Sequence, residues 1–88
     1  MDFRWNDWNV EHIAKHGVSP EEAEIAARRA KRPFPRKMED DKWLVWGRGS
    51  GGRPLQVIFV LDEDDTIYVI HARPLTESEK RRFRRGSK

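Results

Sequence analysis

Four side chains in the second half of the sequence could together bind and activate a phosphate group: Arg48, Arg53, His71 and Arg73. Arginine donates paired hydrogen bonds to phosphoryl oxygens, and histidine exchanges a proton near neutral pH. Apolar runs predict strands over 43–47, 55–61 and 66–73. If these strands pair antiparallel in chain order, the end of the first, the start of the second and the end of the third meet at one edge. We therefore expect the four side chains to converge there; a loose group of loop charges is the alternative.

The last of these strands determines which way two of the side chains point. Successive side chains of a strand alternate between the two faces of a sheet. His71 and Arg73 should therefore share a face with Ile67 and Val69. Because packing does not require a histidine and an arginine together at a strand end, this pair favours a functional interpretation.

A second candidate group lies in the segment HIAKHG, residues 12–17. His12 and His16 are four residues apart and share one face of a helix, with Lys15 beside them. A zinc site of the HExxH type requires glutamate where Ile13 stands, and the chain has no cysteine to complete a ligand set. We therefore expect no metal. Lys15 and His16 can serve an anion or a proton transfer if the helix end packs at the sheet edge, whereas His12 is expected at the helix surface.

Two segments, 28–37 and 80–88, contain six basic residues each and no acidic residue. Such segments attract polyanions, above all RNA or DNA, or a strongly acidic protein; solvated helix ends are the alternative. The residues expected to contact nucleic acid are Arg28, Arg29, Lys31, Arg32, Arg81, Arg82, Arg84 and Arg85. Tryptophans can stack on unpaired bases, although packing is their commoner role in a small domain. The chain has four: Trp5, Trp8, Trp43 and Trp46.

The first elements that position these side chains form a helical hairpin over 7–17 and 20–31. Gly17 can adopt the left-handed conformation that ends a helix. Ser19 with Glu22 forms a capping box that opens the next one.

The remaining elements complete an α+β fold, with the hairpin packed on a three- or four-stranded antiparallel meander. A short edge strand over 35–39 would be the fourth strand. Thr76 with Glu79 forms a second capping box and opens a short basic helix that runs to about Arg85. Neither a repeat nor a linker divides the chain, so we expect a single domain over 1–88.

Length and composition exclude several classes of function. With 88 residues and no cysteine, the chain offers neither a buried pocket for a large cofactor nor a disulfide framework or thiol nucleophile. No apolar run approaches the roughly 18 residues of a membrane span, and the N-terminus lacks the apolar core of a signal peptide. We therefore expect a cytoplasmic protein without a membrane partner.

Three blocks of the sequence resemble, in order, the signature blocks of the BrnT-like ribonuclease toxins of type II toxin-antitoxin pairs: WNDWNVEHIAKHGVSPEEAE, WGRGSGGRPLQVIFV and IYVIHARPLTESEKRRF. Together the blocks cover nearly the whole chain. The chain departs from the family's pattern at His71, where serine is usual, and at Pro20, where phenylalanine is usual.

The resemblance implies a compact RelE-like fold and cleavage of RNA without a metal or another cofactor. It also implies a cognate antitoxin, a small DNA-binding protein encoded beside the toxin. The positions that match the basic residues of the family's motifs are Lys15, His16, Arg48, Arg53 and Arg73.

Cleavage of RNA without a metal requires a base for the 2′-hydroxyl, cations around the phosphorane and an acid for the 5′-oxygen. The arginines can supply the charge, with Lys15 as an auxiliary cation, and His71 or His16 can be the base or the acid. The alternative is a non-catalytic module of the same fold that binds nucleic acid or the antitoxin.

Overall fold

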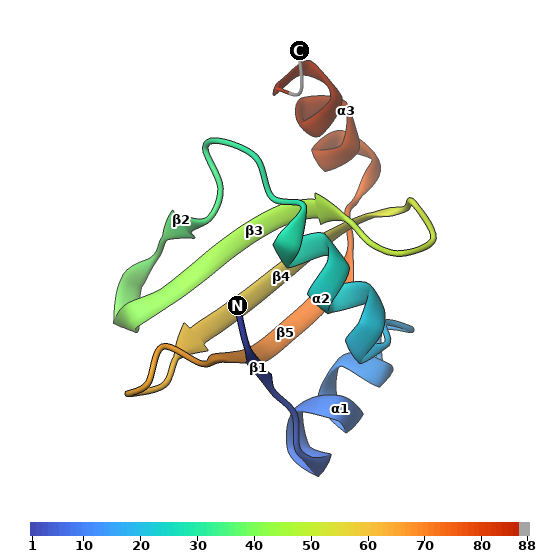
Figure 1. The fold of residues 1–88 in the computed structure, drawn as a ribbon. Helices are drawn as coiled ribbons and strands as arrows, with labels where there is room; N and C mark the ends of the chain where they lie inside the picture. Colours follow the sequence, from blue (N-terminus) through green and yellow to red (C-terminus); the bar gives the residue numbers. More distant parts are fainter. Residues whose placement is uncertain (87–88) are drawn as a thin grey trace.

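The computed structural model describes residues 1–86, which form three α-helices, one 3-10 turn and five strands (Figure 1). In chain order the elements are β1 (Phe3–Arg4), α1 (Asp7–Ala14), α2 (Pro20–Arg28), β2 (Arg36–Lys37), η1 (Glu39–Asp41), β3 (Lys42–Arg48), β4 (Pro54–Leu61), β5 (Ile67–Pro74) and α3 (Glu77–Gly86). None of the helices in this described part is long and apolar enough to cross a membrane.

The strands form one mixed sheet in the order β1-β5-β4-β3-β2. β2, β3, β4 and β5 pair antiparallel, whereas β1 pairs parallel to β5, with Phe3 opposite Ile67. The expected antiparallel strands are present as β2, β3, β4 and β5, whereas the fifth strand, the parallel β1, was not expected. A two-residue strand before the first helix is too short to show the alternation by which strands are recognised in a sequence.

Local hydrogen bonds explain where the first two helices begin. The Asn6 side chain accepts a hydrogen bond from the Asn9 backbone N–H, and the Asn9 side chain accepts one from Asn6 N–H in return. Ser19 and Glu22 make the same exchange at the start of α2. Such reciprocal caps satisfy backbone N–H groups that the first turn of a helix leaves unpaired. Gly17, with φ +71°, turns the chain between the two helices.

α1 and α2 cover one face of the sheet, and α3 projects from the end of β5 (Figure 1). α1 packs against β5, and α2 packs against β3 and β4. The core between these layers contains Ile13, Val18, Ala23, Ala26, Val45, Leu55, Val57, Phe59, Ile67, Val69 and Ala72. Asn9 is also fully buried, and its side chain donates to the Arg4 carbonyl. The opposite face of the sheet, which we call the open face, has no helix packed along it in the described residues, although Arg82 of α3 lies over Trp46 at its β3 side.

A β-bulge in β5 changes the faces of the two side chains that matter most. Val69 lies opposite Phe59 and His71 lies opposite Ile58, so Ile70 is an extra residue in the ladder. Since one extra residue reverses the alternation, Ile67 and Val69 point into the core, whereas His71 and Arg73 point to the open face. The expectation that His71 and Arg73 share a face with Ile67 and Val69 was therefore wrong.

Candidate active site

Three histidines form a cluster beside α1 and β5. His12 lies in α1, His16 in the turn that follows α1, and His71 in β5. The His71 ring centroid lies 5.2 Å from that of His16 and 6.2 Å from that of His12, with the ring planes crossed in both cases. Because α1 packs against β5, two histidines four residues apart both lie close to a histidine of the strand. We call these three residues the histidine cluster.

The surroundings of His71 favour its neutral form. Burial lowers the pKa of the half-buried His71 imidazole, and the nearby positive charges of His16, Arg73 and His12 lower it further. A neutral imidazole has a free ring nitrogen that can accept a proton. His71 can therefore act as a proton acceptor near neutral pH, with a second, more exposed imidazole at His16 beside it.

Aromatic side chains flank the histidine cluster. The Trp8 ring stacks on His12 with centroids 4.8 Å apart and planes within 7°, and the Tyr68 ring lies 6.4 Å from Trp8. The Tyr68 hydroxyl donates to Asn6 Oδ1 at 3.1 Å. The sequence prediction left His12 at the helix surface, away from the site. The spacing of Trp8, His12 and His16 at four-residue intervals is the signal that could have placed all three on one face.

Arg73 lies next to the cluster and is held in place by a carboxylate. Its guanidinium makes two hydrogen bonds to Glu79, of 2.8 and 3.0 Å, and a third to the Pro74 carbonyl. This pairing lowers the pKa of Glu79 from 4.5 to about 2. The arginine has five N–H donors, so its Nε hydrogen and one Nη2 hydrogen are left for a ligand. Because Glu79 belongs to α3, the ion pair also ties that helix to β5.

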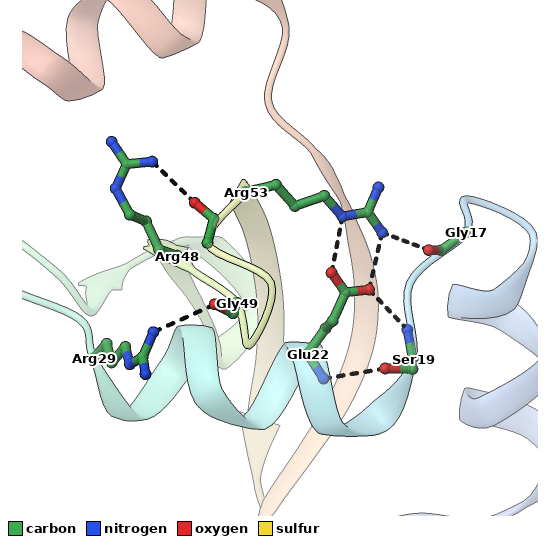
Figure 2. A network of polar contacts seen from close by, with 8 residues as sticks. Gly17, Ser19, Glu22, Arg29, Arg48, Gly49 and Arg53 are labelled. Atoms are coloured by element: carbon green, nitrogen blue, oxygen red, sulfur yellow. Dashed lines mark hydrogen bonds and ion pairs between the residues drawn. The ribbon is translucent and has the colours of Figure 1, made fainter.

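Arg53 extends toward Glu22 and the Gly17 carbonyl (Figure 2). Its guanidinium makes hydrogen bonds of 2.8 and 2.9 Å to Glu22 and one to the Gly17 carbonyl. These contacts join the turn after β3 to the start of α2. Glu22, far away in the sequence, is thus the anion that pairs with Arg53, and the Gly17 carbonyl that Arg53 also contacts belongs to the residue directly after His16.

Arg48 and Lys15 also lie outside the histidine cluster. Arg48 donates to the Gly52 carbonyl at 3.0 Å (Figure 2). Its guanidinium lies over the Phe83 ring at 5.5 Å. Lys15 is exposed just after α1, next to His16 in the sequence. Of the four side chains expected at the sheet edge, the structure therefore brings together His71 and Arg73.

A cleft of about 940 Å³ lies between α3, β3 and the segment that follows α2. Of the described residues that line this cleft, seven are basic and none is acidic. The basic ones are Arg28, Arg29, Lys31, Arg32, Arg36, Arg48 and Arg82. We call this cleft the basic groove. It includes all four of the candidate contacts in 28–32 but only Arg82 of those in α3; the other three, Arg81, Arg84 and Arg85, are exposed and do not line it.

Within residues 1–86, no group of three or more histidine, cysteine, aspartate or glutamate side chains is arranged so that it could hold a metal ion. Imidazole rings such as those of the histidine cluster can form hydrogen bonds and exchange a proton near neutral pH.

Comparison with solved structures identifies the fold. The crystal structure of the ribonuclease toxin BrnT from Brucella abortus superposes with a TM-score of 0.70 and covers 88% of this chain and 99% of that one, at 23% sequence identity. This chain has the BrnT fold. The resemblance in the three sequence blocks thus predicted the fold correctly. No protein-family model and no curated protein sequence matches the chain.

The BrnT fold accounts for the arrangement of elements but not for the side chains at the site. At 23% identity, each functional group has to be judged by its own contacts. The histidine cluster, the Arg73–Glu79 pair and the basic groove are properties of this chain's sequence placed on the BrnT fold.

Proposed function

We propose that this chain is a ribonuclease toxin whose active site is the histidine cluster with Arg73. The observation that carries the proposal is that His71, whose pKa is lowered, faces a second imidazole across 5.2 Å on the open face of the sheet. A proton acceptor and a proton donor at this separation suit the two proton transfers of RNA cleavage. The BrnT fold, known from a ribonuclease toxin, supports the same assignment.

In the proposed reaction, neutral His71 takes the proton of the 2′-hydroxyl. The 2′-oxygen then attacks the phosphorus, and the bond from phosphorus to the 5′-oxygen breaks. Protonated His16 donates its proton to that oxygen, so the products are a 2′,3′-cyclic phosphate and a free 5′-hydroxyl. The remaining donors of Arg73, with Lys15 as an auxiliary cation, stabilise the negative charge on the phosphorane.

The two other arginines have different parts in this proposal. Arg48 points to the open face and can bind a neighbouring phosphate of the same RNA strand. Arg53 is a positioning residue, because its contacts with Glu22 and the Gly17 carbonyl fix the end of α1 that carries His16. The basic side chains in 28–32 and 81–85 attract the RNA through their charge.

A second candidate function is a binding module without catalysis. It is favoured by the carboxylates that pair with Arg53 and Arg73 and reduce the positive charge available to a phosphorane. This module would bind nucleic acid or the antitoxin, and only the ribonuclease would cleave RNA. Cleavage by the purified chain therefore discriminates between them.

We predict that the purified chain cleaves single-stranded RNA and that excess EDTA does not reduce the rate. Proton transfer between imidazoles and stabilisation by guanidinium groups require no metal ion. The measurement is the rate of cleavage of a labelled RNA with and without EDTA. If chelation stops the reaction and zinc or magnesium restores it, the metal-free mechanism is wrong; if the chain never cleaves RNA, the binding module is the better account.

The partner in this proposal is a cognate antitoxin, a small DNA-binding protein encoded next to the toxin. To silence the site it has to cover His71 and Arg73, and an acidic surface would match the net charge of +3.

We predict that the antitoxin associates more slowly as salt rises and that the complex no longer cleaves RNA. Complementary charges accelerate association, and salt screens them. The measurements are association rates with the neighbouring gene's product from low to high ionic strength, followed by a cleavage assay of the complex. Tight binding that leaves the rate of cleavage unchanged would contradict this mode of neutralisation.

A further inference from the structure

The basic groove has a chemistry that the proposed reaction does not use. Three aromatic rings line it, each with a guanidinium over its face: Arg36 over Phe34 at 5.5 Å, Arg82 over Trp46 at 5.1 Å and Arg48 over Phe83 at 5.5 Å. Phe34 and Trp46 also contact each other, with centroids 5.7 Å apart. The groove therefore presents flat apolar surfaces and positive charge side by side.

Among the described residues, no carboxylate pairs with Arg36, Arg48 or Arg82 of the groove, whereas Arg28, which also lines it, pairs with Glu24. Arg4, Arg53 and Arg73 make ion pairs with Asp62, Glu22 and Glu79. By contrast, Arg36, Arg48 and Arg82 lie over aromatic rings, which attract a cation without neutralising it. Of the described residues that line the groove, none is acidic. A ligand with negative charges spaced along a chain would complement this surface.

Aromatic rings select among such ligands. Unpaired bases stack on aromatic side chains and guanidinium planes, whereas the carboxylates of an acidic protein use only the charge. The Trp46 ring is held in its orientation, because its Nε1 donates to Gln56 Oε1 at 3.1 Å. A fixed ring beside cations is the arrangement found where proteins bind single-stranded nucleic acid.

Part of the groove lies on the same face of the sheet as the histidine cluster. Leu44, which lines the groove, pairs with Ile58, and Ile58 pairs with His71, so the three side chains form one row on the open face. Neighbouring strands are about 4.8 Å apart, which places β3 roughly 10 Å from β5. One RNA strand can therefore extend from the groove to the histidines.

We propose that the basic groove is a binding site for single-stranded RNA, in which a base stacks against Trp46 and Phe34 while Arg36, Arg48 and Arg82 bind the flanking phosphates. The site holds the substrate strand next to the histidine cluster, and in this respect it rests on the proposed ribonuclease function. Its occupant is unpaired RNA, because a duplex keeps its bases stacked on one another and cannot offer one to Trp46.

The test measures binding apart from cleavage. A short single-stranded RNA with 2′-O-methyl riboses has no free 2′-hydroxyl, so it binds without being cleaved, and fluorescence anisotropy gives its affinity. Arg36→Gln and Arg82→Gln should each weaken binding by about tenfold. Each should also reduce the slope of log affinity against log salt concentration by the amount that about one phosphate contact contributes. Trp46→Leu should weaken binding by a similar factor and leave the salt dependence unchanged, because stacking releases no counterions.

The matched control is Arg81→Gln, which removes the same charge from the same helix outside the groove. It should weaken binding by less than threefold or so, since only long-range attraction is lost. If Arg81→Gln weakens binding as much as Arg82→Gln, the affinity comes from general charge and the groove is not a site. Equal affinity for double-stranded RNA, or equally strong competition by a poly-glutamate peptide, would also overturn the proposal; the latter would favour an acidic protein as the occupant.

A cleavage assay with a dinucleotide separates this proposal from the proposed function. A dinucleotide at the histidine cluster is too short to reach the groove, so the groove variants should cleave it at the rate of the unmodified chain while cleaving a longer RNA more slowly. If the chain cleaves no RNA but the groove variants still bind the short RNA more weakly, the groove is a binding site and the proposed ribonuclease function is wrong.

Discussion

Replacing His71 by glutamine is expected to lower the rate of RNA cleavage by about a hundredfold or more, because general acid–base catalysis by one side chain contributes at least that factor. Glutamine keeps much of the size and polarity of histidine but cannot exchange a proton. Since His71 is only half-buried on the open face, the variant should fold normally. The measurement is the cleavage rate at saturating RNA, with circular dichroism as a check of the fold. Cleavage at the normal rate would place the chemistry elsewhere.

The dependence on pH gives a second, independent test of this residue. The base has to be neutral, so the rate should rise with pH through the pKa of His71, which lies below the ordinary value of 6.5. His12→Gln removes one of the charges that lower this pKa. The acidic limb of the profile should therefore move to higher pH in that variant, whereas a purely structural role of His12 would change the rate equally at every pH.

Replacing Gly47 by alanine is expected to lower the free energy of unfolding by about 3 kcal/mol, since overpacking at a close contact costs that much. Gly47 is buried in β3 where α2 crosses it, and an added Cβ would overlap the Ala26 carbonyl oxygen. That oxygen belongs to the helix backbone and cannot move without displacing α2. For a domain of this size the melting temperature should fall by on the order of 10–20 °C. Thermal and urea unfolding provide the measurement.

Gly51→Ala is the matched control for this prediction. Gly51 lies in the exposed turn after β3, and nothing would contact its added Cβ within 4 Å. Its stability should stay within about 0.5 kcal/mol of that of the unmodified chain. If the two alanine variants proved equally stable, α2 would lie farther from β3 than the structure has it.

Local rules predicted a large part of this fold. The sequence pair Ser19 and Glu22 identified the start of α2, and the pair Thr76 and Glu79 identified the start of α3, because a capping box is formed within four residues. β3, β4 and β5 begin and end within one residue of the expected limits. The end of α2 was less accurate, since the helix stops at Arg28 rather than near residue 31.

The parts that failed depend on contacts between distant residues. Arg53 and Glu22 are 31 positions apart, and nothing near either one indicates that they pair. The bulge at Ile70 is a property of the paired strands, so alternation within β5 alone could not reveal it. For these reasons the sequence provided candidate residues for the site, but it did not show which of them lie together.

The two outermost strands of the sheet have a consequence for how the chain behaves in solution. β1 and β2 contain two residues each, whereas the three strands between them contain seven or eight. Unpaired strand edges invite other chains to add to a sheet, and short, charged outer strands prevent this. β2 consists of Arg36 and Lys37, and β1 ends at Arg4. Each outer strand covers only two residues of its longer neighbour, Ile67 and Tyr68 of β5 or Trp43 and Leu44 of β3. The outermost strands themselves are thus short and basic, which disfavours the addition of a second copy to them while one face of the sheet stays open to a ligand.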